Sequence, residues 1–367
     1  MFKYFQTQNR PGSSKVIFLC LLALNIISLI CIFSALNQGG AMEREGVFHR
    51  QMMWIAVAWI ALIFTSFVNY RLYFDISYIF FGLNILLLLV VDIMGASAMG
   101  AQRWLSFGGF NFQPSELCKI ATIFLMARLF SRPDAKNFWA GVLYPLVLVG
   151  IASLLIFKQP DLGTALVVIF LFFSIGLSSK LKRRYFILLI VAGMMTFPFA
   201  WHTLKDYQKK RLIVFVNPDT DPLGAGYNII QSKIAIGSGQ LFGKGFLSGT
   251  QNQFSFMPER HTDFIFTVLA EEWGFFGGIF LLFLYWMILS KILDIARFAK
   301  DEFSRLLAVG IGSLFFIHVF INIGMTLGIL PVVGIPLIFM SYGGSNLLIN
   351  TMLVGILANI AKQSRGL

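Results

Sequence analysis

Ten stretches of mostly apolar residues, each about as long as a membrane-spanning helix, dominate this sequence. A helix that crosses the hydrocarbon core of a bilayer needs about 20 such residues. Hydrophobic residues make up 57% of the chain and charged residues only 13%, which leaves too little polar surface to cover a water-soluble globule. We therefore predict an all-α polytopic membrane protein with a single integral membrane domain over residues 1–367. Its ten transmembrane helices are expected near residues 16–36, 51–68, 74–94, 115–130, 140–157, 163–179, 185–201, 265–290, 305–328 and 338–361.

The distribution of lysine and arginine predicts the orientation of these helices. When the N- and C-termini are both placed in the cytoplasm, 17 basic residues lie on the cytoplasmic side. The short outer loops then hold only Arg44, Arg50, Arg103 and Lys158. This bias follows the positive-inside rule, so the net charge of +12 reflects membrane topology and not binding to nucleic acid.

One outer connection is much longer than the others. Residues 202–264 form a single extracytoplasmic loop between helices 7 and 8, with seven basic residues and amphipathic segments at 206–216 and 227–236. Loops of this length are usually functional. A glycine-rich stretch at 237–245 is either a turn or a phosphate cradle, and we favour the turn because no Ser or Thr follows Lys244.

Two ionisable residues lie inside the fourth predicted span. Glu116 and Lys119 are three residues apart, so they share one face of a helix. Charged groups in a membrane are costly and indicate a functional site by default. The alternative is that Glu116 only favours the start of the helix after Pro114 and that the two residues form a structural ion pair.

A second Gln-Pro-acid sequence opens the sixth span. Asp161 lies there beside Lys158, which it could orient, or it could simply be an acid favoured by the N-terminus of the helix. Arg103, in the outer loop before the fourth span, could be an interfacial residue or could grip an anionic head group.

Asp263 lies where the long loop returns to the membrane, directly ahead of an apolar helix. Aspartate is a preferred N-cap residue, which is one explanation. A carboxylate at such a position is also partly desolvated, which raises its pKa and makes it a stronger base. The two readings stay open on the sequence alone.

The last outer connection contains Pro331 and Pro336 and is predicted to be irregular, which a membrane protein tolerates only where the backbone is buried or lines a cavity. His318 and Asn322, four residues apart on the ninth span, predict an interhelical hydrogen-bond site rather than a metal site. With only four histidines in the chain, no metal-ligand cluster is apparent.

Taken together, these motifs resemble the SEDS family, the polytopic proteins of shape, elongation, division and sporulation. The resemblance extends from about Glu43 to the last span, and the long loop is closer to the branch that serves cell elongation. It rests on Gly100-Ala-Gln-Arg-Trp104, Gln113-Pro-Ser-Glu116 with Lys119, Gln159-Pro-Asp-Leu-Gly-Thr164, Asp221-Pro-Leu-Gly-Ala-Gly-Tyr227, Gln231-Ser-Lys-Ile-Ala-Ile-Gly237, Pro258-Glu-Arg-His-Thr-Asp-Phe264, and Gly334-Ile-Pro336 with Ser341-Tyr-Gly-Gly-Ser345.

The resemblance implies a peptidoglycan glycosyltransferase in the bacterial cytoplasmic (inner) membrane, with its active site on the periplasmic face. Such enzymes polymerise lipid II into β-1,4 glycan strands, with inversion and release of undecaprenyl pyrophosphate, together with a class B penicillin-binding protein. Asp263 falls at the position of the family's essential aspartate and would be the catalytic base. Cations and acids at the outer end would bind substrate: Arg103, Glu116, Lys119, Lys158, Asp161, Lys233 and Arg260.

Three points stay open at this stage. A divalent cation, Mg2+ or Mn2+, could replace some of the basic residues at the pyrophosphate. A lipid II flippase would bind the same head group, but should carry charges along a path between the leaflets. A structural scaffold for a penicillin-binding protein would need neither Asp263 nor the Glu116 and Lys119 pair.

Overall fold

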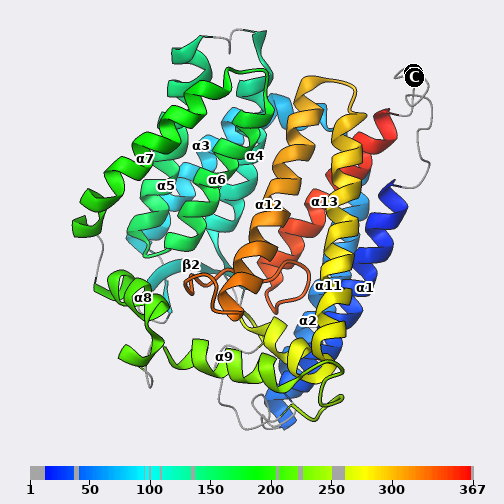
Figure 1. The fold of residues 1–367 in the computed structure, drawn as a ribbon. Helices are drawn as coiled ribbons and strands as arrows, with labels where there is room; N and C mark the ends of the chain where they lie inside the picture. The colour runs from blue at the N-terminus through cyan, green and yellow to red at the C-terminus, as the bar shows by residue number, and fades with distance from the viewer. Residues whose placement is uncertain are drawn as a thin grey trace, which may run out of the picture.

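The computed structural model describes residues 13–36, 41–94, 96–98, 101–107, 110–133, 137–203, 206–221, 226–249 and 261–364. Long helices make up most of it, as Figure 1 shows. They are α1 (Ser13–Ala35), α2 (Ala41–Phe67), α3 (Arg71–Met94), α4 (Pro114–Ser131), α5 (Tyr144–Lys158, after a π-helical turn at Trp139–Leu143), α6 (Leu162–Ser178), α7 (Arg183–Thr203), α11 (Ile265–Arg297), α12 (Glu302–Thr326) and α13 (Gly344–Ser364). The prediction of a helical polytopic membrane protein is confirmed.

Seven of the described helices are long and apolar enough to cross a membrane. The other three expected spans correspond to α4, α6 and α7. Helix α4 is less apolar because it carries Glu116, Lys119 and Arg128, and α6 is only 17 residues long. The last helix begins at Gly344 rather than near residue 338, because residues 337–343 form turns.

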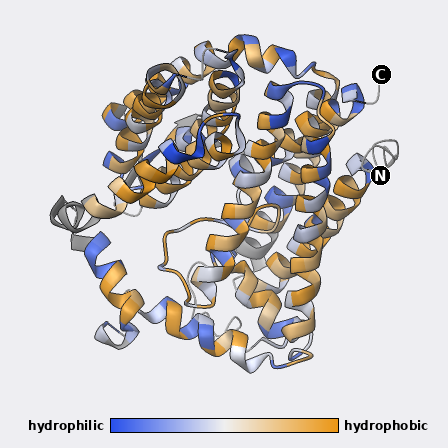
Figure 2. Cartoon of the chain, turned by 45° about the horizontal axis from the view of Figure 1, so that its top comes forward, coloured by the Kyte–Doolittle hydropathy of each residue, from blue (hydrophilic) through white to orange (hydrophobic). Residues whose placement is uncertain are grey.

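Helix α12 joins two groups of helices. One group packs α3, α4, α5 and α6 together, and the other packs α1 against α11 and α2 against α13. Helix α12 contacts α4 and α6 on one side and α11 on the other, while α7 packs chiefly against α6. Figure 2 shows that apolar residues dominate the helices and that hydrophilic residues gather near their ends, as expected for helices that face lipid.

The connection between α3 and α4 contains a small sheet that the sequence analysis did not predict. Strands β1 (Ala96–Ala98), β2 (Ala101–Phe107) and β3 (Phe110–Phe112) pair antiparallel in that order. Ala98 lies opposite Ala101, and Phe107 lies opposite Phe110. The strands are three to seven residues long, too short for a clear alternation of polar and apolar residues to identify them.

The two amphipathic segments of the long loop form helices. These are α8 (Asp206–Val216) and α9 (Tyr227–Ser238), with a 3-10 turn at Pro218–Thr220 between them. Figure 1 shows α9 lying across one end of the bundle. Its buried side chains, Ile229, Ser232 and Ala235, lie on one face, and the helix packs against α11 and α12.

Helix α11 is broken at Gly274, where φ is 67° and ψ is −160°. Its 33 residues would form a straight helix of about 50 Å, longer than the roughly 30 Å hydrocarbon core. The break therefore divides it into a short first part, which follows Asp263, and a second part of membrane length.

The glycine-rich stretch 237–245 supplies hydrogen-bond partners for the backbone at this break. Backbone groups that a continuous helix would pair internally bond to it instead: Phe275 N to Gln240 O (2.9 Å), Phe276 N to Leu241 O (3.2 Å), Lys244 N to Glu271 O (3.0 Å) and Gly245 N to Glu272 O (3.0 Å). A Cβ on Gly243, where φ is 81°, would come within 2.0 Å of the Glu272 carbonyl oxygen. Because Lys244 N–H and Gly245 N–H bond to α11, the stretch is the expected turn and not a phosphate cradle.

Glu271 and Glu272, the two acids ahead of the break, are both buried and bonded. The Glu271 carboxylate forms an ion pair with Lys244 at 2.9 Å, which adds a side-chain contact to the backbone hydrogen bonds. Glu272 accepts a hydrogen bond from Ser34 of α1.

Candidate functional site

The backbone of the turn that carries Asp263 is held by three hydrogen bonds, two from residues 341–342 and one from α12. The Ser341 hydroxyl donates to Thr262 O at 2.6 Å, and Tyr342 N–H donates to His261 O at 2.9 Å. From α12, the Asn322 side-chain amide donates to Asp263 O at 2.8 Å. Each of these three hydrogen bonds ends on a backbone carbonyl oxygen of residues 261–263.

Asp263 is not the N-cap of α11. The helix begins after Phe264, which occupies the N-cap position and makes no side-chain cap hydrogen bond. The Asp263 side chain is half-buried. The capping explanation for this aspartate is therefore wrong.

Gly334 lies beside the Asp263 carboxylate. Its φ is 73°, a left-handed conformation that favours glycine. A Cβ at this position would lie 3.4 Å from Asp263 Oδ2. The irregular segment 331–337 is anchored to α12 because Asn322 Nδ2 also donates to Ile335 O at 2.8 Å. As expected, the two-proline connection is irregular, and it covers one side of the Asp263 turn.

The Glu116 and Lys119 side chains form a buried ion pair in the first turns of α4. Lys119 Nζ lies 2.7 Å from Glu116 Oε1, and the two side chains are only 2% and 7% exposed. Pro114 is in the first turn of the helix and Gln113 is its N-cap, without a side-chain cap bond.

Side chains from two further helices bond to this ion pair. From α12, His318 Nε2 lies 3.1 Å from Lys119 Nζ. From α13, the Asn346 amide donates to Glu116 Oε2 at 2.8 Å, and Asn350 donates to Asn346 O at 2.8 Å. We call Glu116, Lys119, His318 and Asn346 the buried polar network.

Asn346 was not predicted as a site residue, although it directly follows the Ser341–Ser345 motif. An amide in a predicted membrane span was the available signal.

The same helix α12 serves the buried polar network and the Asp263 turn. His318 and Asn322 are one turn apart, about 6 Å along the helix axis. His318 Nδ1 lies 3.2 Å from Pro336 O, while Asn322 bonds to Ile335 O and Asp263 O. The sequence prediction of an interhelical hydrogen-bond site at these two residues agrees with this geometry.

Asp161 does not orient Lys158. Its carboxylate accepts a hydrogen bond from Thr164 N at 3.2 Å and so caps α6. Its other oxygen accepts from Gln113 Nε2 at 3.2 Å and from Ser115 Oγ at 3.4 Å. The expected link to Lys158 is wrong because the start of α4, far away in the sequence, supplies the partners of Asp161. The N-terminal acid alternative is the one that the structure supports.

Arg103 has a bracing role that the sequence did not suggest. It lies on β2, its Nε donates to Gln159 O at 3.0 Å, and it also donates to Pro160 O. Gln159 in turn donates to Leu88 O of α3 at 2.9 Å. Arg103 therefore fastens the small sheet to the turn that precedes Asp161.

The other outer cations are more exposed. Lys158 is the last residue of α5 and its side chain is exposed. Lys233 is exposed on α9, and its side chain passes Gly328, where a Cβ would lie 2.8 Å from Lys233 Nζ. Arg260 lies outside the described residues.

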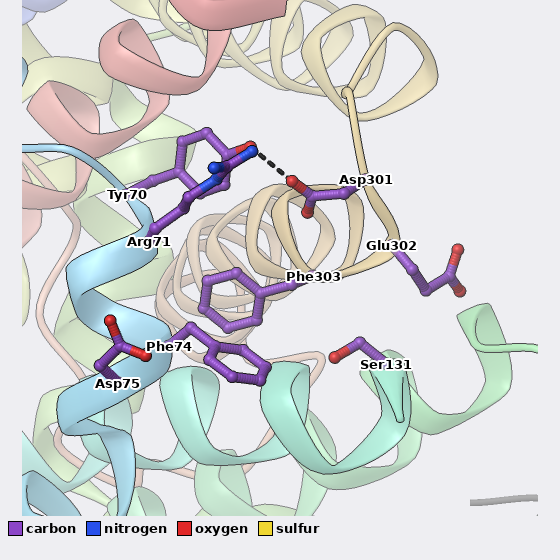
Figure 3. Close-up of a pocket in the computed structure, with 8 residues that line it drawn as sticks. All are labelled: Tyr70, Arg71, Phe74, Asp75, Ser131, Asp301, Glu302 and Phe303. Atoms are coloured by element: carbon purple, nitrogen blue, oxygen red, sulfur yellow. Dashed lines mark hydrogen bonds between the residues drawn. The ribbon is translucent and has the colours of Figure 1, made fainter. Parts of the chain in front are cut away.

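A cavity of about 380 Å3 lies at the opposite end of the bundle (Figure 3). It contains none of the predicted site residues and lies among Tyr70, Arg71, Phe74, Asp75, Ser131, Asp301, Glu302 and Phe303. Tyr70 donates to the Asp301 carboxylate, which also accepts from Ser304 N–H at 2.8 Å and caps α12. Burial raises the pKa of the Tyr70 hydroxyl, and the hydrogen bond to Asp301 raises it further. These contacts serve the fold of this end.

Comparison with known proteins gives consistent relatives along nearly the whole chain. A family model described as cell cycle protein, FTSW/RODA/SPOVE, matches residues 14–366. The chain is 44% identical over 351 residues to the peptidoglycan glycosyltransferase MrdB of Escherichia coli K12, covering 93% of this chain and 91% of that protein. It is 32% identical to the peptidoglycan glycosyltransferase RodA of Treponema pallidum, covering 94% and 96%.

Solved structures share the fold. A chain from a study of how a peptidoglycan synthase complex coordinates polymerisation and crosslinking aligns with a TM-score of 0.80 at 28% identity, over 95% of this chain and 98% of that one. The rod shape determining protein RodA of Thermus thermophilus aligns with a TM-score of 0.71 at 26% identity, over 95% and 96%. The family resemblance drawn from the motifs is thus confirmed, and the chain belongs to the FtsW/RodA/SpoVE family of polytopic cell cycle proteins.

Proposed function

We propose that this protein is a peptidoglycan glycosyltransferase that polymerises lipid II into β-1,4 glycan strands during cell elongation. The 44% identity to MrdB, a peptidoglycan glycosyltransferase, supports the activity, and the likeness to the rod shape determining protein RodA supports the role in elongation. The observation that carries the site is the arrangement on α12, which bonds both to the Asp263 turn and to the buried polar network. The Asp263 carboxylate and the buried Lys119 ammonium are thus both linked to α12, and they suit a reaction that removes a proton and expels an anion.

In this proposal Asp263 is the general base. It takes the proton from the 4-hydroxyl of the GlcNAc of the acceptor lipid II, and the resulting oxygen attacks the anomeric carbon of the donor MurNAc. The bond from that carbon to the lipid pyrophosphate breaks, and undecaprenyl pyrophosphate leaves with the electron pair. A single displacement inverts the α-linkage to a β-linkage without an enzyme nucleophile. General-base catalysis of this kind contributes roughly 10²- to 10⁴-fold.

The leaving pyrophosphate needs positive charge as the bond breaks. Lys119 is the best-placed described cation, because Glu116 and His318 hold it rigidly. Lys158, Lys233 and Arg260 are proposed as further substrate-binding cations, whereas Arg103 and Asp161 shape the site through the turn at residues 159–161.

The described residues do not by themselves supply a complete set of ligands for a divalent cation. Among the residues that the structure describes, no group of three or more His, Cys, Asp or Glu side chains is placed to hold a metal ion. Glu116, the buried acid nearest to Lys119, is already neutralised by it. We propose that Mg2+ or Mn2+, where used, is bound mainly by the pyrophosphate oxygens.

The membrane arrangement completes the proposal. In this proposal the chain crosses a bacterial inner membrane ten times, with both termini in the cytoplasm and the 202–264 loop in the periplasm, where Asp263 meets lipid II. The partner is a class B penicillin-binding protein that crosslinks the peptides of the new strand. The solved relative from a peptidoglycan synthase complex supports a partner of this type.

We expect the purified protein to form glycan polymer from lipid II, and to form more of it in the presence of its penicillin-binding partner. The measurement is gel separation of labelled polymer with time, with the Asp263→Asn variant as control for contaminating polymerases. A flippase or a scaffold would give the same trace polymer for both proteins, and that result would refute the proposed activity.

Topology is tested separately with introduced cysteines. Ser248, in the long loop, and Lys180, between α6 and α7, are both exposed, and the Lys180 side chain is 81% exposed. We expect Ser248→Cys in whole cells to react with an impermeant maleimide after the outer membrane is permeabilised, and Lys180→Cys to react only after the inner membrane is opened. The native cysteines, Cys20, Cys31 and Cys118, are buried and give a low background. The reverse pattern would overturn the orientation.

A further inference from the structure

His318 is the one histidine of the described residues that is enclosed within the helix bundle at the buried polar network. It is 1% exposed, on the part of α12 that packs between α4 and the irregular segment 331–337. Both of its ring nitrogens are engaged, Nδ1 with Pro336 O at 3.2 Å and Nε2 with Lys119 Nζ at 3.1 Å. The ring therefore connects the irregular segment beside Asp263 to the ion pair of α4.

These two contacts fix the protonation of the ring. A carbonyl oxygen can only accept, so Nδ1 must carry the hydrogen that is shared with Pro336. If Nε2 were also protonated, two donor groups would face each other 3.1 Å apart in a buried site. His318 is therefore neutral, with its Nε2 lone pair accepting from the Lys119 ammonium. This assignment is the one that satisfies both contacts.

These contacts define the direction in which the remaining N–H of the Lys119 ammonium points. An ammonium group has three N–H donors, and the described part of the chain supplies acceptors for two of them, Glu116 Oε1 at 2.7 Å and His318 Nε2 at 3.1 Å. A flexible lysine side chain with one acceptor can rotate, whereas two acceptors on different helices fix the third N–H. Because one acceptor is neutral, the ammonium keeps more of its positive charge for an anionic ligand than it would between two carboxylates.

We propose that His318 is a positioning residue that aims the third N–H of Lys119 at a pyrophosphate oxygen of the donor lipid. It acts through Lys119 and does not touch the reacting atoms. Its Nδ1–H fixes the ring against the segment that lies beside Asp263, so the cation for the leaving group and the base for the acceptor are held at a set separation. This inference rests on the proposed function of Lys119.

Two substitutions separate the contacts of the ring. In His318→Gln the amide reaches the position of Nε2, so its oxygen can accept from Lys119. In His318→Asn the amide stays at the position of Nδ1, so it can donate to Pro336 O but cannot reach Lys119. A role in aiming Lys119 needs the first contact, whereas a role in stability alone needs buried hydrogen bonding of either kind. Ser313→Ala is the control on α12, because it removes a hydrogen bond to Ser174 of α6 away from the network.

The experiment measures initial rates of polymerisation against lipid II concentration, with the melting temperature of each purified variant. We expect His318→Gln to keep kcat within about threefold, and His318→Asn to lose roughly 10- to 100-fold in kcat with a much smaller change in KM. A misplacement of about 1 Å at a catalytic group has an effect of this size. Ser313→Ala should resemble the unmodified protein. If His318→Asn melts far below the other variants, binding of undecaprenyl pyrophosphate to its folded fraction is measured in place of the rate. We expect this binding to be weaker for His318→Asn than for His318→Gln.

The outcome separates this inference from the function on which it rests. Equal activity in the Gln and Asn variants would refute a positioning role, as would activity that falls only in proportion to the folded fraction. An equal loss of activity in both variants at an unchanged melting temperature would also refute it, because an acceptor for Lys119 at the position of Nε2 would then make no difference. In each of these cases a Lys119→Met variant that makes no polymer would leave the proposed function of Lys119 standing. An active Lys119→Met variant would remove that function instead.

Discussion

Replacing Asp263 with Asn is expected to reduce glycan polymerisation from lipid II by roughly 100- to 10,000-fold, because the amide cannot accept the proton of the attacking hydroxyl. The fold should tolerate the change. The hydrogen bonds that hold this turn to α12 and to the start of α13 end on the carbonyl oxygens of residues 261–263, which the substitution leaves in place. Asp263 is also not the N-cap residue of α11, a position that Phe264 occupies.

Rates with purified protein, melting temperature and capture of the penicillin-binding partner test this expectation together. Asp294→Asn is the matched control, because Asp294 lies near the other end of α11 and bonds to Lys291 at 3.2 Å. The two side chains are partly exposed and three residues apart on one helix, and pairs of this kind contribute little, so the control should keep its rate and stability. Chain growth at the normal rate by the Asp263→Asn variant would show that the base lies elsewhere.

The helices could be predicted from the sequence because length and hydropathy fix them locally. The predicted helix near 163–179 lies at Leu162–Ser178. The two segments of the long loop that the sequence marks as amphipathic are helices in the structure. The break at Gly274 was not predicted. A glycine within an apolar run does not reveal a helix break, and here the break depends on backbone hydrogen bonds from residues more than 25 positions away.

The site could be predicted only where its contacts are local. Glu116 and Lys119 are three residues apart on one helix, so their spacing indicates a pair. The partners of Asp161 come from Gln113 and Ser115, which are 48 and 46 residues away, and nothing in the local pattern identifies them. The same limit applies to Arg103, whose carbonyl partners depend on a sheet that is too short to recognise in the sequence.

The second large effect on stability and polymerisation is expected from substitutions that break the ion pair between Glu116 and Lys119 on α4. Lys119→Met leaves the Glu116 carboxylate buried with only the Asn346 amide as a described partner. Glu116→Gln leaves the Lys119 ammonium with neutral acceptors, the introduced amide oxygen and the His318 imidazole, and without a compensating negative charge. Removing one partner of a buried pair costs about 3–5 kcal/mol of stability, because the remaining charge is uncompensated. Each single variant should therefore melt at a lower temperature and lose polymerisation by at least about 100-fold, the effect of removing one donor that stabilises a developing anion.

The double variant, Glu116→Leu with Lys119→Met, separates stability from catalysis. It removes both charges, and replacing a buried ion pair by apolar residues of similar volume is often neutral or stabilising. We therefore expect its melting temperature to return close to that of the unmodified protein while polymerisation stays absent. A structural pair would behave differently, since activity would return with stability. Polymer formation by a stable double variant would thus assign Glu116 and Lys119 to the fold, and the charge of the leaving pyrophosphate would have to be met by the exposed cations Lys158 and Lys233 or by a bound divalent cation.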